Sequence, residues 1–113
     1  QWPSSAASDV YKRQKLNSVL KDRKNKDPEE SYVASLYKKG LDHTCNKIEE
    51  EANELVNALE SENKERVISE AADLWFHSLV ALSMKNLSSD DILNELDKRF
   101  GISGHEEKNK RQA

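Results

Sequence analysis

Apolar residues recur at spacings of three and four along most of the chain, the pattern of amphipathic α-helices. Between residues 41 and 60 one continuous apolar stripe is formed by Leu41, Cys45, Ile48, Ala52, Leu55 and Leu59. It predicts a long helix over 41–60, with Cys45 as a small core residue. A second long helix is predicted from Lys64 or Glu65 to about Lys85, because one face gathers Val67, Ile68, Ala71, Leu74, Trp75, Ser78 and Leu82.

Two shorter helices are predicted before this pair. The first runs from Lys15 to about Lys26 and ends ahead of Pro28, since the residue before a proline disfavours the helical conformation. The second lies within the motif SYVASLYKKG, where Ser31 begins the helical stretch and Gly40 ends it.

The two ends of the chain lead to different expectations. A last helix is predicted from Ser88 or Ser89, which cap it, to about Phe100. Residues 1–14 show no helical period, and we expect a disordered or non-native leader there. The domain is then expected to comprise residues 15–113.

The pattern favours an all-α fold whose core is completed by a second copy of the chain. Leu, Ile, Val and Phe together supply only 24 of the 113 residues, so the core is thin. Phe76 and Val80 lie on the opposite side of the second long helix from its main apolar face, which indicates a helix surrounded on two sides. Three glycines and two prolines leave little material for hairpins. We therefore expect a bundle of four to five helices that forms a homodimer.

Composition narrows the class of protein. The formal net charge of -3 gives no broad basic surface for nucleic acid. No apolar run approaches the ~20 residues that span a bilayer, so no membrane partner is expected. A single cysteine cannot form an internal disulfide, and a reducing, cytoplasmic setting is expected. The sequence also contains neither a glycine-rich phosphate loop nor a nucleophile elbow.

Acidic residues form the most informative pattern. Glu51 and Glu54 are spaced i, i+3 at the edge of the apolar stripe, and Glu70 and Asp73 repeat this spacing on the next helix. If the two helices pack antiparallel, the four carboxylates converge. Carboxylates so placed repel one another unless a cation lies between them, and hard oxygen ligands suit Mg²⁺ or Mn²⁺. The pattern therefore predicts a metal-dependent site for phosphate chemistry.

Other interpretations of the same residues stay open. An acidic run on a helix is most often a solvated face. A di-iron site would use Glu-x-x-His pairs, which the three histidines do not form. His77 follows Asp73 by one turn, so it either supports the acidic site or is an ordinary hydrogen-bonded surface residue. Trp75 and Phe76 are expected in the core or in a dimer interface.

Three motifs resemble the phosphoribosyl-ATP pyrophosphohydrolase family, a group related to the MazG-like all-α pyrophosphohydrolases. They are SYVASLYKKG followed by LDHTCNKIEEEANEL, then SEAADLWFHSLVAL, then LNELDKRFGISGHEEK, and the resemblance spans about residues 16–111. Its metal motif, EExxE followed by ExxD, corresponds here to Glu50, Glu51, Glu54, Glu70 and Asp73. The family usually has glycine before the acid pair, and Glu49 takes that place here, which puts the fine metal affinity in question.

The resemblance implies Mg²⁺-dependent hydrolysis of phosphoribosyl-ATP to phosphoribosyl-AMP and pyrophosphate, the second step of histidine biosynthesis. It implies an all-α dimer, with Glu51 or Glu54 as general base. The residues that it suggests for the substrate phosphates are Lys39, Lys47, Ser103, Gly104, Lys108 and Arg111. Two alternatives are kept: a house-cleaning pyrophosphatase acting on dUTP or non-standard nucleotides, and a non-catalytic helical interaction module.

Overall fold

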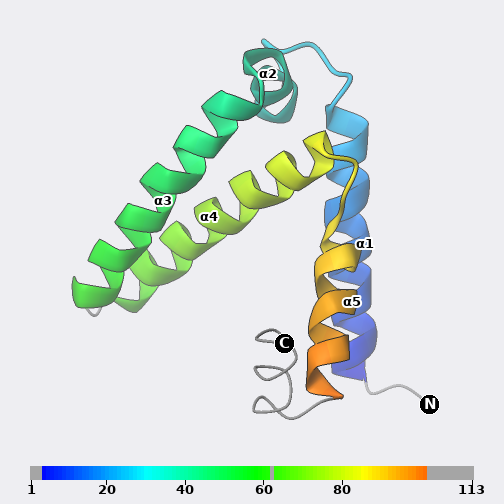
Figure 1. Ribbon diagram of the computed structural model, residues 1–113, viewed down its shortest axis with the longest axis vertical. Coiled ribbons are helices and arrows are strands. Elements are labelled where there is room, and N and C mark those ends of the chain that lie inside the picture. The colour runs from blue at the N-terminus through cyan, green and yellow to red at the C-terminus, as the bar shows by residue number, and fades with distance from the viewer. Residues whose placement is uncertain (1–3, 62, 102–113) are drawn as a thin grey trace, which may run out of the picture.

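The computed structural model of the chain describes residues 4–61 and 63–101, and this part is helical with no strand. The helices are α1 (Ser4–Arg23), α2 (Tyr32–Lys39), α3 (Leu41–Ser61), α4 (Lys64–Met84) and α5 (Ser89–Phe100), as Figure 1 shows. The predicted all-α fold is thus confirmed. None of these helices combines the length and the apolar character that a bilayer-spanning segment needs.

Local capping interactions fix α2 where the sequence predicted it. The Ser31 hydroxyl accepts a hydrogen bond from the main-chain N–H of Ala34 at 3.3 Å, which satisfies one free donor of the first turn. Gly40 ends the helix with a φ of 96°, a conformation that side-chain-bearing residues rarely adopt. The start of α5 is equally local, because Ser88 and Asp91 form a capping box.

The first helix begins at Ser4 and not at Lys15, so the expectation of disorder is wrong for residues 4–14. A helix needs no apolar stripe where nothing in the sequence breaks it, and residues 4–14 contain neither proline nor glycine. That residues 1–14 form a leader outside the domain stays a prediction.

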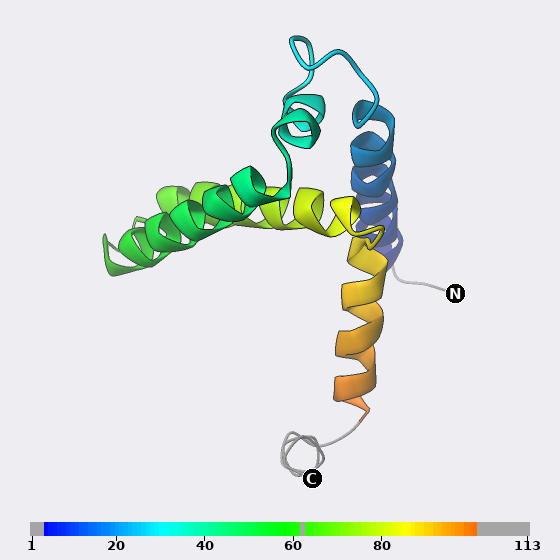
Figure 2. The same ribbon diagram turned by 45° about the horizontal axis from the view of Figure 1, so that its top comes forward.

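Helices α3 and α4 lie side by side and antiparallel, in agreement with their short connection (Figure 1), and Figure 2 shows the same arrangement from a second direction. The beginning of α5 lies against α1. There Ser89 Oγ donates to Asn17 Oδ1 at 2.9 Å, and Arg13 pairs with Asp90 at 3.1 Å. The chain therefore consists of a long helical hairpin with α1, α2 and α5 gathered toward one end of it.

The apolar core lies where α1, α2 and α4 meet. It consists of Leu20 from α1, Val33 and Leu36 from α2, and Val80 from α4, and both Leu36 and Val80 are fully buried. Leu16, Tyr37, Phe76, Leu79 and Met84 pack around these side chains. This core is small, as the composition indicated, and it holds one end of α4 in place.

The stripe predicted as the buried face of α3 is only partly buried in the structure. Cys45 is exposed, which corrects its assignment to the core, and Leu59 is 57% exposed. The buried residues of α3 are instead Thr44, Glu51 and Ala58. On α4 the expected apolar face is likewise open at Ile68 and Trp75, and Val80 on the opposite side is buried. A helix with two apolar sides can cover only one of them within this chain.

Candidate functional site: an acidic cluster between two helices

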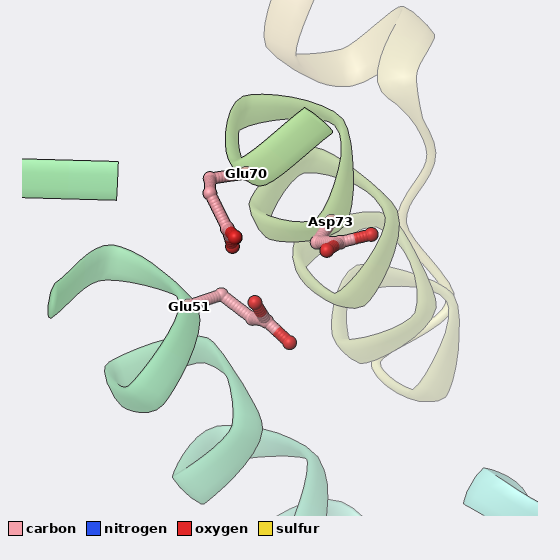
Figure 3. Close-up of side chains that lie close together, drawn as sticks. All are labelled: Glu51, Glu70 and Asp73. Atoms are coloured by element: carbon pink, nitrogen blue, oxygen red, sulfur yellow. The ribbon is translucent and has the colours of Figure 1, made fainter. Parts of the chain in front are cut away.

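Three carboxylates meet in the gap between α3 and α4. Each of Glu51, Glu70 and Asp73 offers one oxygen, and these oxygens lie within 4.8 Å of one another. Figure 3 shows Glu51 reaching from α3 toward the other two side chains, which both come from α4. Of the four carboxylates that the i, i+3 spacing predicted to converge, these three come together across the hairpin, and Glu54 is not in the group.

The local sequence explains how Glu51 comes to face α4. Thr44, Glu51 and Ala58 follow one another at seven-residue intervals, so they share one face of α3. Thr44 and Ala58 are small and fully buried, which lets the two helices approach closely around Glu51. As a result Glu51 is only 8% exposed, whereas Glu70 is half-buried and Asp73 is exposed.

The carboxylates raise one another's pKa values. Burial raises the pKa of Glu51, and the negative charges of Glu54 and Asp73 add to this effect. The pKa of Glu70 is raised mainly by a hydrogen bond shared with the Glu54 carboxyl, and then by burial and by the charges of Glu54, Asp73 and Glu51. Ionising the whole cluster is therefore unfavourable without a compensating positive charge.

The buried oxygens of the cluster fit a hard cation. Glu51 Oε2 and Glu70 Oε2 are inaccessible to solvent and have no hydrogen-bond partner in the described part of the chain. Buried polar atoms are nearly always satisfied by a protein group, water or an ion. The donors are all carboxylate oxygens, which suit Mg²⁺ or Mn²⁺ better than a softer metal. A divalent cation would therefore suit these carboxylates and would give the two buried oxygens the partner that they lack in the described part of the chain.

The remaining predicted residues occupy different places. Glu54 lies beside the cluster, in contact with Glu70. Glu50 is exposed, and Lys47 Nζ lies 3.6 Å from its carboxylate, so the structure does not bring Glu50 into the group of three. Lys39 is exposed in the last turn of α2. The predicted phosphate contacts at Ser103, Gly104, Lys108 and Arg111 lie outside the described residues.

A contact that the sequence pattern did not show is the one between Tyr32 and His77. His77 is 5% exposed, so it is not an ordinary surface histidine, and its Nε2 lies 2.8 Å from the Tyr32 hydroxyl. The Asp73–His77 spacing of one turn was the only signal in the sequence. No local pattern could indicate that Tyr32, more than forty residues earlier, would reach the same ring.

The chain is similar to known proteins over most of its length. The sequence model of the family described as phosphoribosyl-ATP pyrophosphohydrolase matches residues 13–100. Phosphoribosyl-ATP pyrophosphatase of Hydrogenovibrio crunogenus is 55% identical over 97 residues, covering 82% of this chain and 86% of the relative. The enzyme of the same name from Methylococcus capsulatus is 48% identical, covering 87% of this chain and 93% of the relative. The one from Ruthia magnifica is 47% identical, covering 86% of this chain and 92% of the relative.

The chain thus belongs to the phosphoribosyl-ATP pyrophosphohydrolase family, as its three motifs indicated. The match spans all five helices in whole or in part, including both helices that carry the acidic cluster. The interpretation of the chain as a non-catalytic helical module is therefore set aside. The family match begins at residue 13, close to the start that we expected for the domain.

The raised pKa of Glu51 predicts how the stability of the metal-free protein depends on pH. Because the folded chain holds this proton more tightly than the unfolded chain, the contribution of Glu51 is fully present below about pH 4.3 and is lost as the pH rises through the folded-state pKa. We expect Glu51→Gln to raise the melting temperature at pH 8 by several degrees and to change it little at pH 4. Thermal unfolding followed by circular dichroism in the presence of a chelator measures this.

Glu49→Gln is a matched control, because Glu49 is an exposed acid two residues away on the same helix. It should leave both melting temperatures nearly unchanged. An equal or lower melting temperature of Glu51→Gln at pH 8, relative to the unsubstituted chain, would show that the cluster is not under electrostatic strain.

Proposed function

We propose that this protein hydrolyses phosphoribosyl-ATP to phosphoribosyl-AMP and pyrophosphate, the second step of histidine biosynthesis, with Mg²⁺ held by the acidic cluster. The observation that carries the proposal is the group of three converging carboxylates with two buried, unpartnered oxygens. The family membership and the substrate named for its relatives support the choice of reaction. The reaction would take place in the cytoplasm.

The metal ligands in this proposal are Glu51, Glu70 and Asp73. Glu54 lies beside these three and Glu50 lies farther out, and both belong to the proposed metal motif. Mn²⁺ would serve in place of Mg²⁺, since both prefer oxygen ligands. A cation held by these carboxylates would neutralise charge on the triphosphate and would lower the pKa of the attacking water. The chain itself supplies the closely packed hairpin that keeps the carboxylates together.

A carboxylate of the cluster would also accept the proton of the attacking water. Glu51 and Glu54 are the candidates. Water would form a bond to phosphorus as the bond from phosphorus to the departing pyrophosphate breaks. Lys39, Lys47 and the cationic and small residues of the tail (Ser103, Gly104, Lys108 and Arg111) would bind the phosphates of the substrate.

We further propose that the protein is a homodimer. Val56 and Leu59 on α3, and Ile68 and Trp75 on α4, are all more than half exposed in the single chain. Large apolar surface left open on two neighbouring helices is typical of an interface between subunits. A second copy would cover these sides and supply the core that the composition lacks.

The reaction is tested by measuring pyrophosphate release from phosphoribosyl-ATP, dUTP and dITP, with Mg²⁺ and with a chelator. We expect phosphoribosyl-ATP to have the highest kcat/KM by at least ~100-fold and all activity to vanish with the chelator. A preference for dUTP or dITP would instead identify a house-cleaning pyrophosphatase. Absence of metal-dependent release from all three substrates would refute the proposal.

Substitutions in the cluster test which residues carry the chemistry. Glu51→Gln, Glu54→Gln and Asp73→Asn each keep the size of the side chain but remove a charge, so each should lower kcat by ~100-fold or more without unfolding the protein. Glu49→Gln should retain near-normal kcat. Circular dichroism establishes that each variant is folded. Near-normal turnover in all three cluster variants would contradict the site assignment.

Sedimentation at low micromolar concentration tests the dimer. We expect a particle of two chains, about twice the 12.9 kDa of one, because the open apolar sides of α3 and α4 are unfavourable in water. Trp75→Glu would place a charge on that surface and should shift the protein toward monomer. A folded monomer of the unsubstituted chain at this concentration would exclude the interface.

A further inference from the structure

A chain of hydrogen bonds joins α2 to the turn of α4 that carries Asp73. The Tyr32 hydroxyl lies 2.8 Å from His77 Nε2, and His77 Nδ1 lies 2.9 Å from the main-chain oxygen of Asp73. A carbonyl oxygen can only accept, so Nδ1 carries a proton. In the neutral ring Nε2 then accepts from the Tyr32 hydroxyl. The bonds therefore run in one direction, from Tyr32 through His77 to Asp73.

The surroundings of His77 make this hydrogen bond difficult to replace. The imidazole is 5% exposed, so an Nε2 that loses its donor would be left with little access to water. Tyr32 itself is 48% exposed, and its ring stacks on Phe76 with the centroids 5.9 Å apart. Phe76 also meets His77 edge to face at 5.2 Å. Removing only the hydroxyl of Tyr32 would therefore break the hydrogen bond and keep the aromatic packing.

His77 also lies beside the acidic cluster without belonging to it. It follows Asp73 by one helical turn, and its Nδ1 is bonded to the main-chain oxygen of Asp73, whose carboxylate belongs to the cluster. The Nδ1 bond to the Asp73 carbonyl places the imidazole against the same helical turn from which the Asp73 carboxylate projects. Residues that orient a metal ligand from outside commonly affect metal affinity strongly.

We propose that Tyr32 and His77 form a positioning pair that fixes the Asp73 turn of α4 relative to α2. This inference rests on the proposed metal site. The pair touches neither the cation nor the reacting atoms. Its role is to keep Asp73 at the separation from Glu51 that cation binding requires. It would also keep α2, with Lys39 in its last turn, at a constant position relative to the cluster.

A second hydroxyl contact between the same two helices provides a matched control. The Tyr37 hydroxyl is hydrogen-bonded to Ser83 Oγ, which in turn donates to the main-chain oxygen of Val80 at 2.7 Å. Ser83 lies roughly 15 Å beyond Asp73 along the axis of α4, at 1.5 Å per residue. Tyr37→Phe thus removes the same atom from the same helix but leaves the cluster untouched.

The experiment measures Mn²⁺ binding by titration calorimetry, together with thermal unfolding of the metal-free protein, for the unsubstituted chain, Tyr32→Phe and Tyr37→Phe. We expect Tyr32→Phe to weaken Mn²⁺ binding by about three- to tenfold and Tyr37→Phe to change it by less than about twofold. Both should lower the melting temperature to a similar extent, since each removes one hydrogen bond. Equal Mn²⁺ affinities in the two variants would overturn the proposal.

Substitutions of His77 test whether the two side chains act as one unit. His77→Leu should weaken Mn²⁺ binding, and adding Tyr32→Phe to it should cause no further loss, because the bond is already gone. His77→Gln keeps an amide oxygen that can accept from Tyr32, so it should retain more affinity than His77→Leu. Independent, additive losses would overturn the positioning pair. If the unsubstituted chain bound no Mn²⁺, the proposed metal site itself would fail, and this inference with it.

Discussion

Burial of a carboxylate between two antiparallel helices is the constraint on which the rest of the structure depends. Glu51 occupies the face of α3 that packs on α4, where an apolar side chain would ordinarily stabilise the hairpin. Burying an ionised group beside other acids costs free energy, because burial and the negative charges of Glu54 and Asp73 both disfavour the ionised form of Glu51. At this position the hairpin therefore has an acidic side chain in place of an apolar contact.

The apolar core and the contacts of α2 with α4 stabilise the fold against the free-energy cost of burying Glu51. The apolar core is formed by α1, α2 and α4, so α4 is anchored toward its C-terminal end, at Val80, and the acids lie nearer its beginning. The hydrogen bond from Tyr32 to His77 connects these two regions. The open apolar sides of α3 and α4 leave a further surface that a second chain would cover. In this arrangement the three carboxylates are positioned by packing and hydrogen bonds outside the cluster, because the interactions among the carboxylates themselves are repulsive.

The sequence predicted the elements because their boundaries are local. Ser31, Gly40 and Ser88 act on neighbouring backbone groups, and the structure places them as the caps that their spacing indicated. The acidic pairs were predictable for the same reason, since i, i+3 spacing fixes their relative direction on each helix. The burial of Glu51 was not predictable, because the stripe from Leu41 to Leu59 is more apolar than the line formed by Thr44, Glu51 and Ala58. Periodicity shows that a helix has an apolar side, but the choice between two sides is a long-range property.

The charge of the cluster also determines how substrate and cation must depend on each other. A triphosphate is strongly negative, and an acidic cluster without a cation would repel it. Under the proposed function, a cation held among Glu51, Glu70 and Asp73 would remove that repulsion and would attract the phosphate oxygens. Under the proposed function, each partner therefore increases the affinity for the other by the same factor, because coupling between two binding events is reciprocal. The electrostatic strain of the metal-free cluster then favours cation binding and makes the capture of substrate depend on it.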